Sequence, residues 1–427
     1  MKISVIGSGY VGTVTAACLA ELGHEVICID IDPEKVDMIN RGVPPIYEEG
    51  LEDLLKKYAG TRIRATSDYD DAVNNTDVSF ICVGTPSDAD GNIDLSIVKA
   101  ASRSLGQAIG KKNDYHVVVV KSTVVPETTE NVVMTHIQET SGKKAGIEFG
   151  IAMNPEFLRE GKAVYDFMHP DKIVVGAIDE RSDRVVSSLY AGIECEITHT
   201  NPKTAEMIKY VNNSFLATKI SFSNEIGNIC KQLGIDTYQV MKAVGKDFRI
   251  SPYFLNSGAG FGGSCFPKDV KALIGKAKEL RYKPQLLESV VQVNEIQPLK
   301  MIELLESRLG KLDSKKIAVL GLAFKNDTDD IRESRSIPVI KTLLNKGAII
   351  SAYDPMAADN MEKIYPDIEY CDSAKQALES VDGCLVMTEW DEFRTLCSEF
   401  KTMHRPLVID GRNVIHCDDI EYVGLCW

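Results

Sequence analysis

Short apolar runs alternate with longer amphipathic segments along the first 200 residues of the chain. The apolar runs lie at residues 2–6, 25–30, 63–66, 78–83, 116–121, 149–153 and 173–175. Several of them are almost continuously apolar, which is typical of parallel strands buried on both faces. Residues 11–22 have the spacing of a helix, and Gly23 marks its end. The pattern predicts a doubly wound sheet that binds ligands at the carboxyl ends of its strands.

The remaining half of the chain contains one helical stretch and then a repeat of the opening pattern. Residues 203–233 show no strand pattern and no proline after Pro202, which predicts a long central helix. From about residue 315, apolar runs resemble those of the first sheet; they lie at residues 317–321, 349–355 and 384–387. The predicted fold is therefore α/β, with two Rossmann-like doubly wound domains joined by a long central helix and a helical middle domain. The predicted boundaries are 1–200, 201–305 and 306–427.

The first apolar run leads directly into the pattern Gly-x-Gly-x-x-Gly, formed by Gly7, Gly9 and Gly12. Between a strand and a helix, this pattern predicts a dinucleotide site: a tight turn, close approach of the pyrophosphate, and close packing of helix on strand. Asp30 ends the second predicted strand, where a carboxylate binds the ribose hydroxyls and repels a 2′-phosphate. The cofactor is thus predicted to be NAD rather than NADP. Asp32 is able to share this role, and the alternative is a strand that ends in solvated acids.

Composition limits the remaining classes of function. The 427 residues carry a net charge of −14, with 44% hydrophobic and 26% charged residues, which is typical of a globular protein and disfavours nucleic acid as a partner. We expect no signal peptide, because glycines interrupt the first apolar run, and no membrane span, because no apolar segment is long enough. The eleven cysteines contain no Cys-x-x-Cys pair, so they indicate neither a disulfide framework nor a metal site. This usage predicts a reducing, cytoplasmic location.

The segment Gly-Phe-Gly-Gly-Ser-Cys-Phe-Pro-Lys-Asp at residues 260–269 carries the most distinctive chemistry. It brings a thiol at Cys265 close in sequence to an ammonium at Lys268 and a carboxylate at Asp269. Neighbouring amides and a lysine favour the thiolate, the nucleophilic form of cysteine. The alternative is a glycine-rich turn in which the cysteine only packs. The other motifs of the chain favour a reactive thiol.

Polar residues follow several other predicted strands or lie on the central helix. Thr85 and Thr123 are candidates for cofactor hydrogen bonds, although Ser122 or Thr123 is equally suited to cap a helix. Glu156 and Glu160 would share a face if their segment is helical, and they are candidates for positioning a water or a substrate hydroxyl.

Lys209 and Asn213 lie four residues apart on the predicted central helix, so both are able to reach one oxygen. The alternative is an ordinary solvated helix face. In the last third, Gly-Leu-Ala-Phe-Lys at 321–325 replaces the glycine pattern, which makes Lys325 a candidate diphosphate ligand. Arg332 is able to pair with its acidic neighbours instead of a ligand, and Arg412 also follows a strand end.

These motifs, in this order over essentially the whole chain, resemble the UDP-glucose/GDP-mannose dehydrogenase family. They are Gly-x-Gly-x-x-Gly with Asp30, Asn-Pro-Glu-Phe-Leu-Arg-Glu-Gly at 154–161, the cysteine segment, and Gly-Leu-Ala-Phe-Lys followed by Asp-Asp-Ile-Arg-Glu-Ser at 329–334. The resemblance is strongest to the branch that acts on UDP-glucose. It implies an NAD-dependent four-electron oxidation of UDP-glucose to UDP-glucuronate, through a thiohemiacetal and a thioester on Cys265.

The resemblance also implies a role for each matched residue. For catalysis it implies Cys265, Lys209, Asn213, Asp269, Glu156 and Thr123. For NAD it implies Gly7, Gly9, Val11, Gly12, Asp30, Lys35, Thr85, Thr123, Glu160, Lys268 and Arg332. For the nucleotide sugar it implies Phe157, Leu158, Arg159, Glu160, Lys209, Asn213, Arg249, Phe254, Leu255, Asn256, Ser257, Gly258, Gly262, Lys325 and Arg412. The resemblance places the dimer contact of the family on the central helix, so it implies a homodimer, in which Arg249 reaches the sugar site of the neighbouring subunit.

Three alternatives remain from the sequence. The same chemistry on GDP-mannose or UDP-N-acetylmannosamine differs by few pocket contacts, which change sugar preference by only a few kcal/mol. A two-electron β-hydroxyacid dehydrogenase would leave Cys265 and residues 315–427 unexplained. A nucleotide sensor or scaffold on an inactive dehydrogenase fold would be expected to lack part of the set Cys265, Lys209, Asn213 and Asp269, which is intact.

Overall fold

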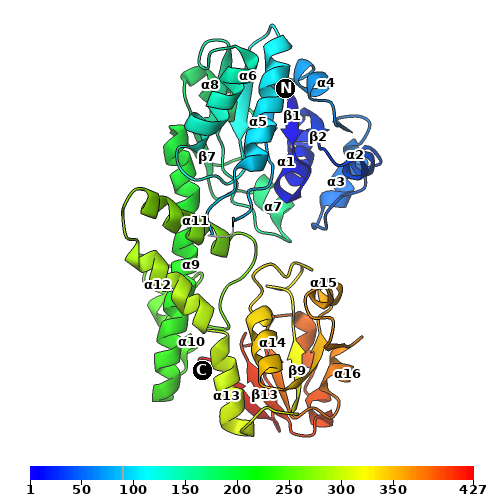
Figure 1. Ribbon diagram of the computed structural model, residues 1–427, viewed down its shortest axis with the longest axis vertical. Helices are drawn as coiled ribbons and strands as arrows, with labels where there is room; N and C mark the ends of the chain where they lie inside the picture. Colours follow the sequence, from blue (N-terminus) through cyan, green and yellow to red (C-terminus); the bar gives the residue numbers. More distant parts are fainter. Residues whose placement is uncertain (89–90) are drawn as a thin grey trace. The chain divides into compact units, whose positions relative to one another are not determined.

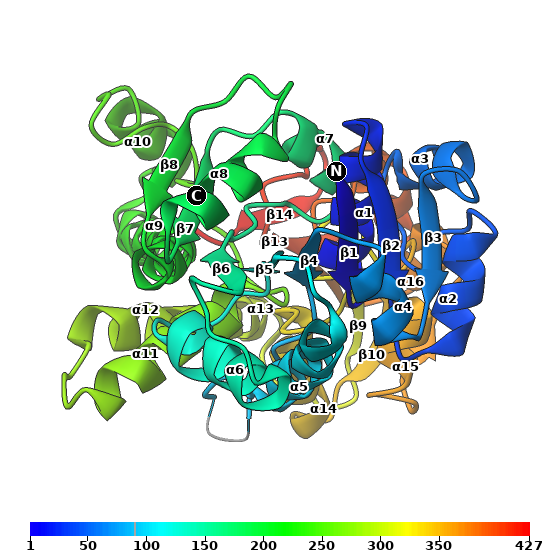
Figure 2. The same cartoon turned by 90° about the horizontal axis from the view of Figure 1, so that it is seen from above.

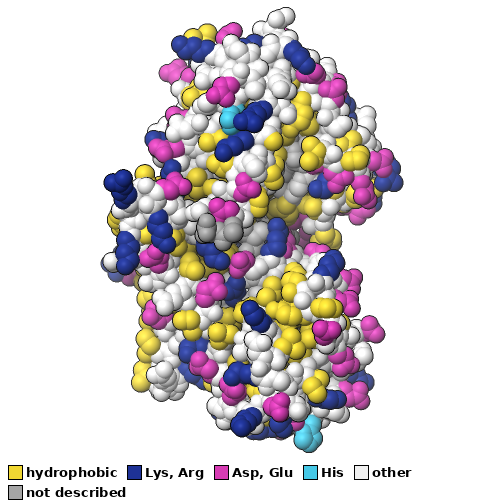
Figure 3. Space-filling view, in the orientation of Figure 1, with side chains coloured by type: hydrophobic (Ala, Val, Ile, Leu, Met, Phe, Trp, Pro, Cys, Tyr) yellow, Lys and Arg dark blue, Asp and Glu magenta, His cyan; other side chains and the backbone are white. Residues whose placement is uncertain are grey.

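The computed structural model describes residues 1–88 and 91–427. The chain forms two compact units, an N-terminal unit of Met1–Asn212 and a C-terminal unit of Asn213–Trp427. Both are drawn in Figure 1 with their helices and strands labelled. Basic and acidic side chains are interspersed over the face shown in Figure 3. Among the described residues, no helix is long and apolar enough to cross a membrane, and no group of three potential metal ligands is found.

The N-terminal unit is built on an eight-stranded sheet with the order β3-β2-β1-β4-β5-β6-β7-β8. Its strands are β1 Lys2–Ile6, β2 Glu25–Ile29, β3 Ile63–Thr66, β4 Val78–Ile81, β5 His116–Val120, β6 Phe149–Met153, β7 Ile173–Ala177 and β8 Ile197–Thr200. Neighbouring strands are parallel except β6 and β7, which are antiparallel. The connection from β6 to β7 contains only the six-residue helix α7, Ala163–Met168. At about 9 Å, this helix is too short to return the chain along the sheet for a parallel strand.

Helices cover both faces of this sheet because side chains alternate along each strand. In β5, Val117 and Val119 join one core with α1, α3, α7 and α8, whereas Val118 and Val120 join a second core with α4, α5 and α6 (Figure 2). The helices are α1 Tyr10–Glu21, α2 Pro33–Asn40, α3 Leu51–Tyr58, α4 Tyr69–Asn74, α5 Ser96–Lys111, η1 Thr129–Met134, α6 Thr135–Ser141 and α8 Glu180–Ser188.

The predicted central helix is confirmed as α9, Pro202–Leu233, which runs from the N-terminal unit into the C-terminal unit. Proline at its first position fits the free N–H groups of a helix start, and the Asn201 carboxamide accepts a hydrogen bond from the Thr204 N–H at 2.9 Å. Six further helices precede or flank the second sheet; they are α10 Thr237–Val244, α11 Phe266–Glu279, α12 Gln285–Ile296, α13 Leu299–Leu309, α14 Ser336–Asn345 and α15 Ala358–Glu362.

The second sheet has six parallel strands in the order β11-β10-β9-β12-β13-β14. They are β9 Lys316–Leu320, β10 Ile349–Tyr353, β11 Glu369–Tyr370, β12 Gly383–Val386, β13 Leu407–Asp410 and β14 Glu421–Gly424. The short helices α16 Ala374–Leu378, η2 Asp391–Thr395 and η3 Glu399–Thr402 complete this unit. When the strands of this sheet are numbered from one, their order is 3-2-1-4-5-6. Strands β1–β6 of the first sheet have the same order, which is the Rossmann order. The two predicted Rossmann-like sheets are thus confirmed.

One prediction about cysteine is wrong. Cys397 and Cys417 form a disulfide in the C-terminal unit, with their Cα atoms 5.4 Å apart. No local spacing signals this pair, because the chain passes through η3 and β13 between the two residues before it returns to the same place. Nine other cysteines are not disulfide-bonded, and of these Cys265 is exposed.

Candidate active site

The glycine pattern of the N-terminal unit forms a tight cradle between β1 and α1. Gly7 has a φ of +94°, and a Cβ there would lie 2.9 Å from the Cys82 carbonyl oxygen. A Cβ on Gly12 would lie 1.8 Å from the Gly7 carbonyl oxygen, so only glycine lets the helix pack this closely. A Cβ on Gly9 would meet nothing within 4 Å, and Gly9 is the N-cap of α1. This open, positively polarised helix start fits the pyrophosphate of a dinucleotide.

Asp30 follows β2 and is tied to the same cradle. Its Oδ2 accepts a hydrogen bond from the Ser8 N–H at 2.6 Å, and its Oδ1 accepts one from the Asp32 N–H at 3.0 Å. Asp32 is instead the N-cap of α2, where its side chain accepts from the Glu34 N–H at 2.9 Å. The carboxylate of Asp30 is therefore fixed at the strand end where a ribose is bound in this fold.

Loops from three further strands reach the same edge of the sheet. Thr85 follows β4, Thr123 follows β5, and Glu156 follows β6, and these strands are neighbours in the order β1-β4-β5-β6. The alternative of a helix cap at Ser122 or Thr123 is wrong, because η1 begins only at Thr129. The Ser122 hydroxyl instead donates to the Val83 carbonyl at 2.7 Å and joins the loops after β4 and β5.

A buried ion pair lies beside this edge. The Lys209 ammonium of α9 is 2.9 Å from the Glu156 carboxylate, and the two residues are 3% and 7% exposed. Burial alone would raise the pKa of Glu156, but the charge and hydrogen bond of Lys209, with the Leu158 N–H at 2.6 Å, lower it. The structure therefore supplies an ionised carboxylate and an ammonium in a water-poor setting. The alternative of a solvated helix face at Lys209 is wrong.

The segment that carries Glu156 is irregular rather than helical, so Glu156 and Glu160 do not share a helix face. Proline at 155 removes one N–H donor and restricts the residue before it. Side chains hold the segment instead. Arg159 forms two hydrogen bonds to Asp166, at 2.9 and 2.6 Å. The ring of Phe157 lies 5.4 Å from the Lys209 ammonium.

In the C-terminal unit, Cys265 is the exposed N-cap residue of α11. One turn later, Asp269 is 1% exposed, and its N–H donates to the Cys265 carbonyl at 2.9 Å. The two oxygens of Asp269 accept separate hydrogen bonds, from the Lys268 ammonium at 2.7 Å and from the Asn213 carboxamide at 2.6 Å. Asp269, Lys268 and Asn213 thus form one hydrogen-bonded cluster one turn after Cys265. The start of a helix also favours negative charge on the sulfur.

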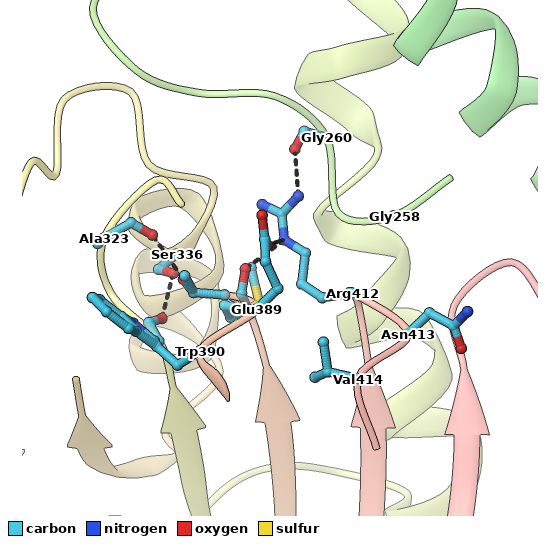
Figure 4. Close-up of polar contacts among 12 residues, drawn as sticks. Gly258, Gly260, Ala323, Ser336, Glu389, Trp390, Arg412, Asn413 and Val414 are labelled. Atoms are coloured by element: carbon cyan, nitrogen blue, oxygen red, sulfur yellow. Dashed lines mark hydrogen bonds and ion pairs between the residues drawn. The ribbon is translucent and has the colours of Figure 1, made fainter. Parts of the chain in front are cut away.

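The loop before Cys265 borders a cavity of about 290 Å³ in the same unit. Its lining includes Asn256, Ser257, Gly258 and Arg412, all of which the sequence predicts to bind the nucleotide sugar. The Arg412 guanidinium points toward the loop (Figure 4): its Nη1 donates to the Gly260 carbonyl at 3.2 Å and its Nε to the Met387 carbonyl at 2.7 Å.

The remaining predicted residues are held by local partners or are exposed. Arg332 pairs with Asp330 at 2.6 Å, and Arg249 pairs with Asp247 at 2.5 Å on an exposed turn. Lys325 lies in the loop after β9, partly exposed, and its ammonium is 3.4 Å from the Asn326 carbonyl oxygen. In the N-terminal unit, Val11 is the second residue of α1 and Lys35 lies in the first turn of α2.

Sequence reasoning missed three buried amides that contact the cysteine loop: Asn224 of α9, Asn294 of α12 and Gln297, the residue that follows α12. They are 0%, 3% and 1% exposed. The available signal was a polar residue on an otherwise apolar helix face: Leu287, Val290 and Asn294 recur at helical spacing. A buried polar side chain needs a partner, so this position pointed to a specific contact.

Comparison with known proteins assigns this arrangement to a class. Sequence profiles of the UDP-glucose/GDP-mannose dehydrogenase family match residues 1–194 as its NAD binding domain, 203–296 as its central domain and 318–417 as its UDP binding domain. The fold and these matches define an NAD-dependent oxidoreductase that acts on nucleotide sugars. The chain belongs to the UDP-glucose/GDP-mannose dehydrogenase family.

Individual relatives agree on the chemistry but differ in the sugar. The UDP-glucose 6-dehydrogenase AglM of Haloferax volcanii is 50% identical over 420 residues, covering 97% of each chain. A GDP-mannose 6-dehydrogenase of Pseudomonas putida is 38% identical over 442 residues and covers both chains completely. The solved UDP-glucose dehydrogenase of Pyrobaculum islandicum superimposes with a TM-score of 0.94 at 42% identity, covering 100% of this chain and 98% of that one.

Proposed function

We propose that the protein oxidises UDP-glucose to UDP-glucuronate, a four-electron reaction that consumes two NAD⁺ and one water. The observation that carries this proposal is the exposed Cys265 at the start of α11, with the buried Asp269 one turn behind it. An alcohol dehydrogenase without a nucleophile stops at the aldehyde, whereas a thiolate makes a second oxidation possible. The 50% identity to a UDP-glucose 6-dehydrogenase supports UDP-glucose as the sugar nucleotide.

The oxidation takes place in two hydride transfers from C6 of the sugar. The C6 hydroxyl loses a proton and C6 loses a hydride, which gives the aldehyde. The Cys265 sulfur adds to the aldehyde carbon and forms a C–S bond in a thiohemiacetal. Loss of a second hydride and a proton from this adduct gives a thioester, and water then breaks the C–S bond to release the carboxylate and the thiol. Bound NAD⁺ supplies the hydride acceptor for each oxidation.

Each catalytic residue receives a role that its surroundings support. Asp269, together with an ordered water, is the general base, because its carboxylate is buried and oriented by Asn213 and Lys268. Lys209 and Asn213, four residues apart in α9, stabilise the developing oxyanion. Glu156, ionised beside Lys209, assists hydrolysis of the thioester, and Thr123 orders the water.

The binding assignments made from the sequence remain part of the proposal. The glycine cradle, Asp30 and the loops after β4 and β5 bind NAD, with Lys35, Glu160, Lys268 and Arg332 as further contacts. The cysteine loop, Phe157–Glu160, Lys325 and Arg412 bind the nucleotide sugar. The three-domain division at residues 200 and 305 likewise stays a prediction.

We also propose that two copies of the chain associate through α9. In the C-terminal unit, this helix exposes Phe215, Phe222, Ile229 and Leu233 by 51–67%, a set of large apolar side chains at helical spacing. Light scattering of the wild-type protein is expected to give twice the mass of one chain. The Phe222→Asp substitution should lower this mass. Ile364→Asp, at a residue 47% exposed after α15, is the matched control and should leave the mass unchanged. A wild-type monomer would refute this part.

A cytoplasmic location completes the proposal. Nine cysteines that are not disulfide-bonded are typical of a reducing compartment, and Cys397–Cys417 is the exception.

The decisive experiment measures total NADH from a limiting amount of UDP-glucose with excess NAD⁺, for wild type and Cys265→Ser, with the product identified by mass. Two NADH per sugar and UDP-glucuronate from wild type, with incomplete oxidation by the variant, are expected. Activity only with GDP-mannose or UDP-N-acetylmannosamine would keep the chemistry and replace the substrate. One NADH per sugar regardless of Cys265 would indicate a two-electron dehydrogenase.

A further inference from the structure

The glycine-rich segment before Cys265 is held by buried side-chain amides, in addition to backbone hydrogen bonds at 2.9 Å from Ala259 to Gly411 and from Gly263 to Arg332. The Gly258 N–H donates to the Asn224 carboxamide oxygen at 2.7 Å, and the Gly258 carbonyl accepts from Gln297 at 3.0 Å. Three residues later, the Phe261 N–H donates to the Asn294 oxygen at 2.8 Å, and the Phe261 carbonyl accepts from the Asn294 amide at 2.9 Å. All three amide residues are at most 3% exposed.

Asn294 satisfies both backbone groups of Phe261 with one carboxamide, as a paired peptide would. Gly260 makes this approach possible. It has a φ of +101°, and a Cβ there would lie 2.7 Å from the Asn294 oxygen. Gly262 and Gly263 are constrained in a similar way. A Cβ on Gly262 would lie 2.4 Å from the Glu333 carbonyl oxygen, and a Cβ on Gly263 would lie 2.7 Å from the Phe324 ring.

The fixed backbone of Phe261 is coupled to the nucleophile through its side chain. The Phe261 ring packs edge-on against the Phe266 ring, with centroids 6.1 Å apart. Phe266 directly follows Cys265 and is the first residue of α11. The same small core contains Val270 of α11 and Val290 of α12, one turn before Asn294. Movement of the Phe261 backbone therefore displaces the turn that carries the thiol.

We propose that Asn294 is a positioning residue for Cys265, acting through the backbone and ring of Phe261. The proposal rests on the role of Cys265 given above. Loss of the Asn294 carboxamide leaves two buried backbone groups of the loop without partners and releases the N-terminal turn of α11. A thiol that is displaced by as little as 1 Å is expected to lower kcat by roughly 10- to 100-fold.

The first variant is Asn294→Leu, which has a similar shape but no hydrogen-bonding groups. We expect kcat to fall by roughly 10- to 100-fold, with KM for both substrates changed less than about threefold. Mass mapping of iodoacetamide modification is expected to show slower alkylation of Cys265, because the thiol leaves the helix start that favours the thiolate. The half-buried Cys195 serves as internal reference in the same samples.

A second variant separates positioning from general stability. In Asn294→Asp, the ionised carboxylate accepts from the Phe261 N–H but has no hydrogen for the Phe261 carbonyl, whereas the protonated form restores both bonds. The ratio of its kcat to wild type should therefore rise from about pH 8.5 to about pH 6, while the ratio for Asn294→Leu stays flat. The nearby ionisable groups are Arg335, Lys271, Glu295 and Glu333. Arg335 already pairs with Glu333 at 3.0 Å and Glu295 at 3.9 Å, and Lys271 pairs with the same two carboxylates at 3.6 and 3.9 Å.

Ser221→Ala is the matched control, because it removes another buried hydrogen bond to α12, from the Ser221 hydroxyl to the Val290 carbonyl at 2.9 Å, without touching the loop. Its kcat should equal that of wild type. Wild-type kcat and alkylation in Asn294→Leu would overturn the proposal. If that variant does not fold, a flat pH ratio in Asn294→Asp would overturn it. If wild type and Cys265→Ser both release one NADH per sugar, the proposed function fails. The alkylation rate of Cys265 in Asn294→Leu still tests the positioning role of Asn294 in that case.

Discussion

The first turns of the two Rossmann-like sheets begin identically and then serve different purposes. Gly7 follows β1 with a φ of +94°, and Gly321 follows β9 with a φ of +93°. Each packs so tightly on the loop of the neighbouring strand, at Cys82 or Thr388, that a Cβ would clash. After this shared turn, the N-terminal unit continues with the open glycine cradle, whereas the C-terminal unit continues with Ala323 and Phe324 and ends in Lys325.

The carboxylates after the second strands differ in the same sense. Asp30 accepts two backbone hydrogen bonds and is partly exposed. Asp354 is 4% exposed and accepts five, from the Trp390 indole and from four backbone N–H groups, at residues 322, 323, 356 and 357. One fold position thus keeps a carboxylate available for a ribose in one unit and uses it as an internal clamp in the other.

The largest effect is expected from Asp354→Ala. The substitution leaves five donors without their acceptor, four of them buried, so the C-terminal unit should lose about 4 kcal/mol of unfolding free energy. Urea unfolding followed by tryptophan fluorescence measures this directly, because both tryptophans, Trp390 and Trp427, lie in that unit. The matched control is Asp30→Ala, at the equivalent position of the other unit. Equal stability of Asp354→Ala and wild type would contradict the clamp.

The next effect concerns the disulfide, for which the N-terminal unit has no counterpart among its described residues. A loop of the length closed by Cys397 and Cys417 is expected to stabilise the C-terminal unit by about 3 kcal/mol. Cys397→Ser, Cys417→Ser and reduced wild type should therefore unfold at the same lower urea concentration in the tryptophan signal. A difference between the two variants would show that one serine, rather than the lost bond, causes the change.

Much of this comparison was predictable from the sequence, and its limits are physical. Apolar runs predict strands because a strand buried on both faces needs them, and Gly-x-Gly-x-x-Gly predicts the first cradle because its spacing is local. The Glu156–Lys209 pair, the disulfide and the Asn294 contacts join segments far apart in sequence, and no periodic pattern records such pairs. The antiparallel β7 was missed because strand direction depends on the length of the preceding helix, which periodicity resolves poorly.

A buried polar network gives the N-terminal unit an acid sensitivity that the other sheet lacks at the matching positions. Ser4 and Ser79 hydrogen-bond at 2.5 Å, and Ser79 contacts His116 Nε2 at 2.7 Å. The corresponding residues of the C-terminal sheet are Ala318 and Cys384. Burial, with the nearby Lys112 ammonium, lowers the pKa of His116 to about 3.

The lowered pKa of His116 sets the direction in which stability changes with pH. The unfolded chain binds a proton on His116 below about pH 6.5 and the folded chain does not until about pH 3, so stability is full above pH 6.5 and is lost as the pH falls. The loss should reach about 2 kcal/mol by pH 5. Hydrogen exchange in β1, β4 and β5 should accelerate between pH 7.5 and 5 after correction for intrinsic rates, and His116→Gln should reduce this change. An unchanged pH dependence in the variant would assign the sensitivity to other groups.

The smallest effect on stability is expected at Asp30. Asp30→Ala removes two partly exposed hydrogen bonds, so the unfolding free energy of its unit should change by less than about 1 kcal/mol. Binding of NAD⁺ should weaken roughly 10-fold, through the lost contact to the ribose hydroxyls. Because the carboxylate also repels a 2′-phosphate, binding of NADP⁺ should weaken less or improve. Calorimetric titration with both cofactors measures the two affinities. An equal loss for NAD⁺ and NADP⁺ would mean that Asp30, like Asp354, acts only as a clamp on its first turn.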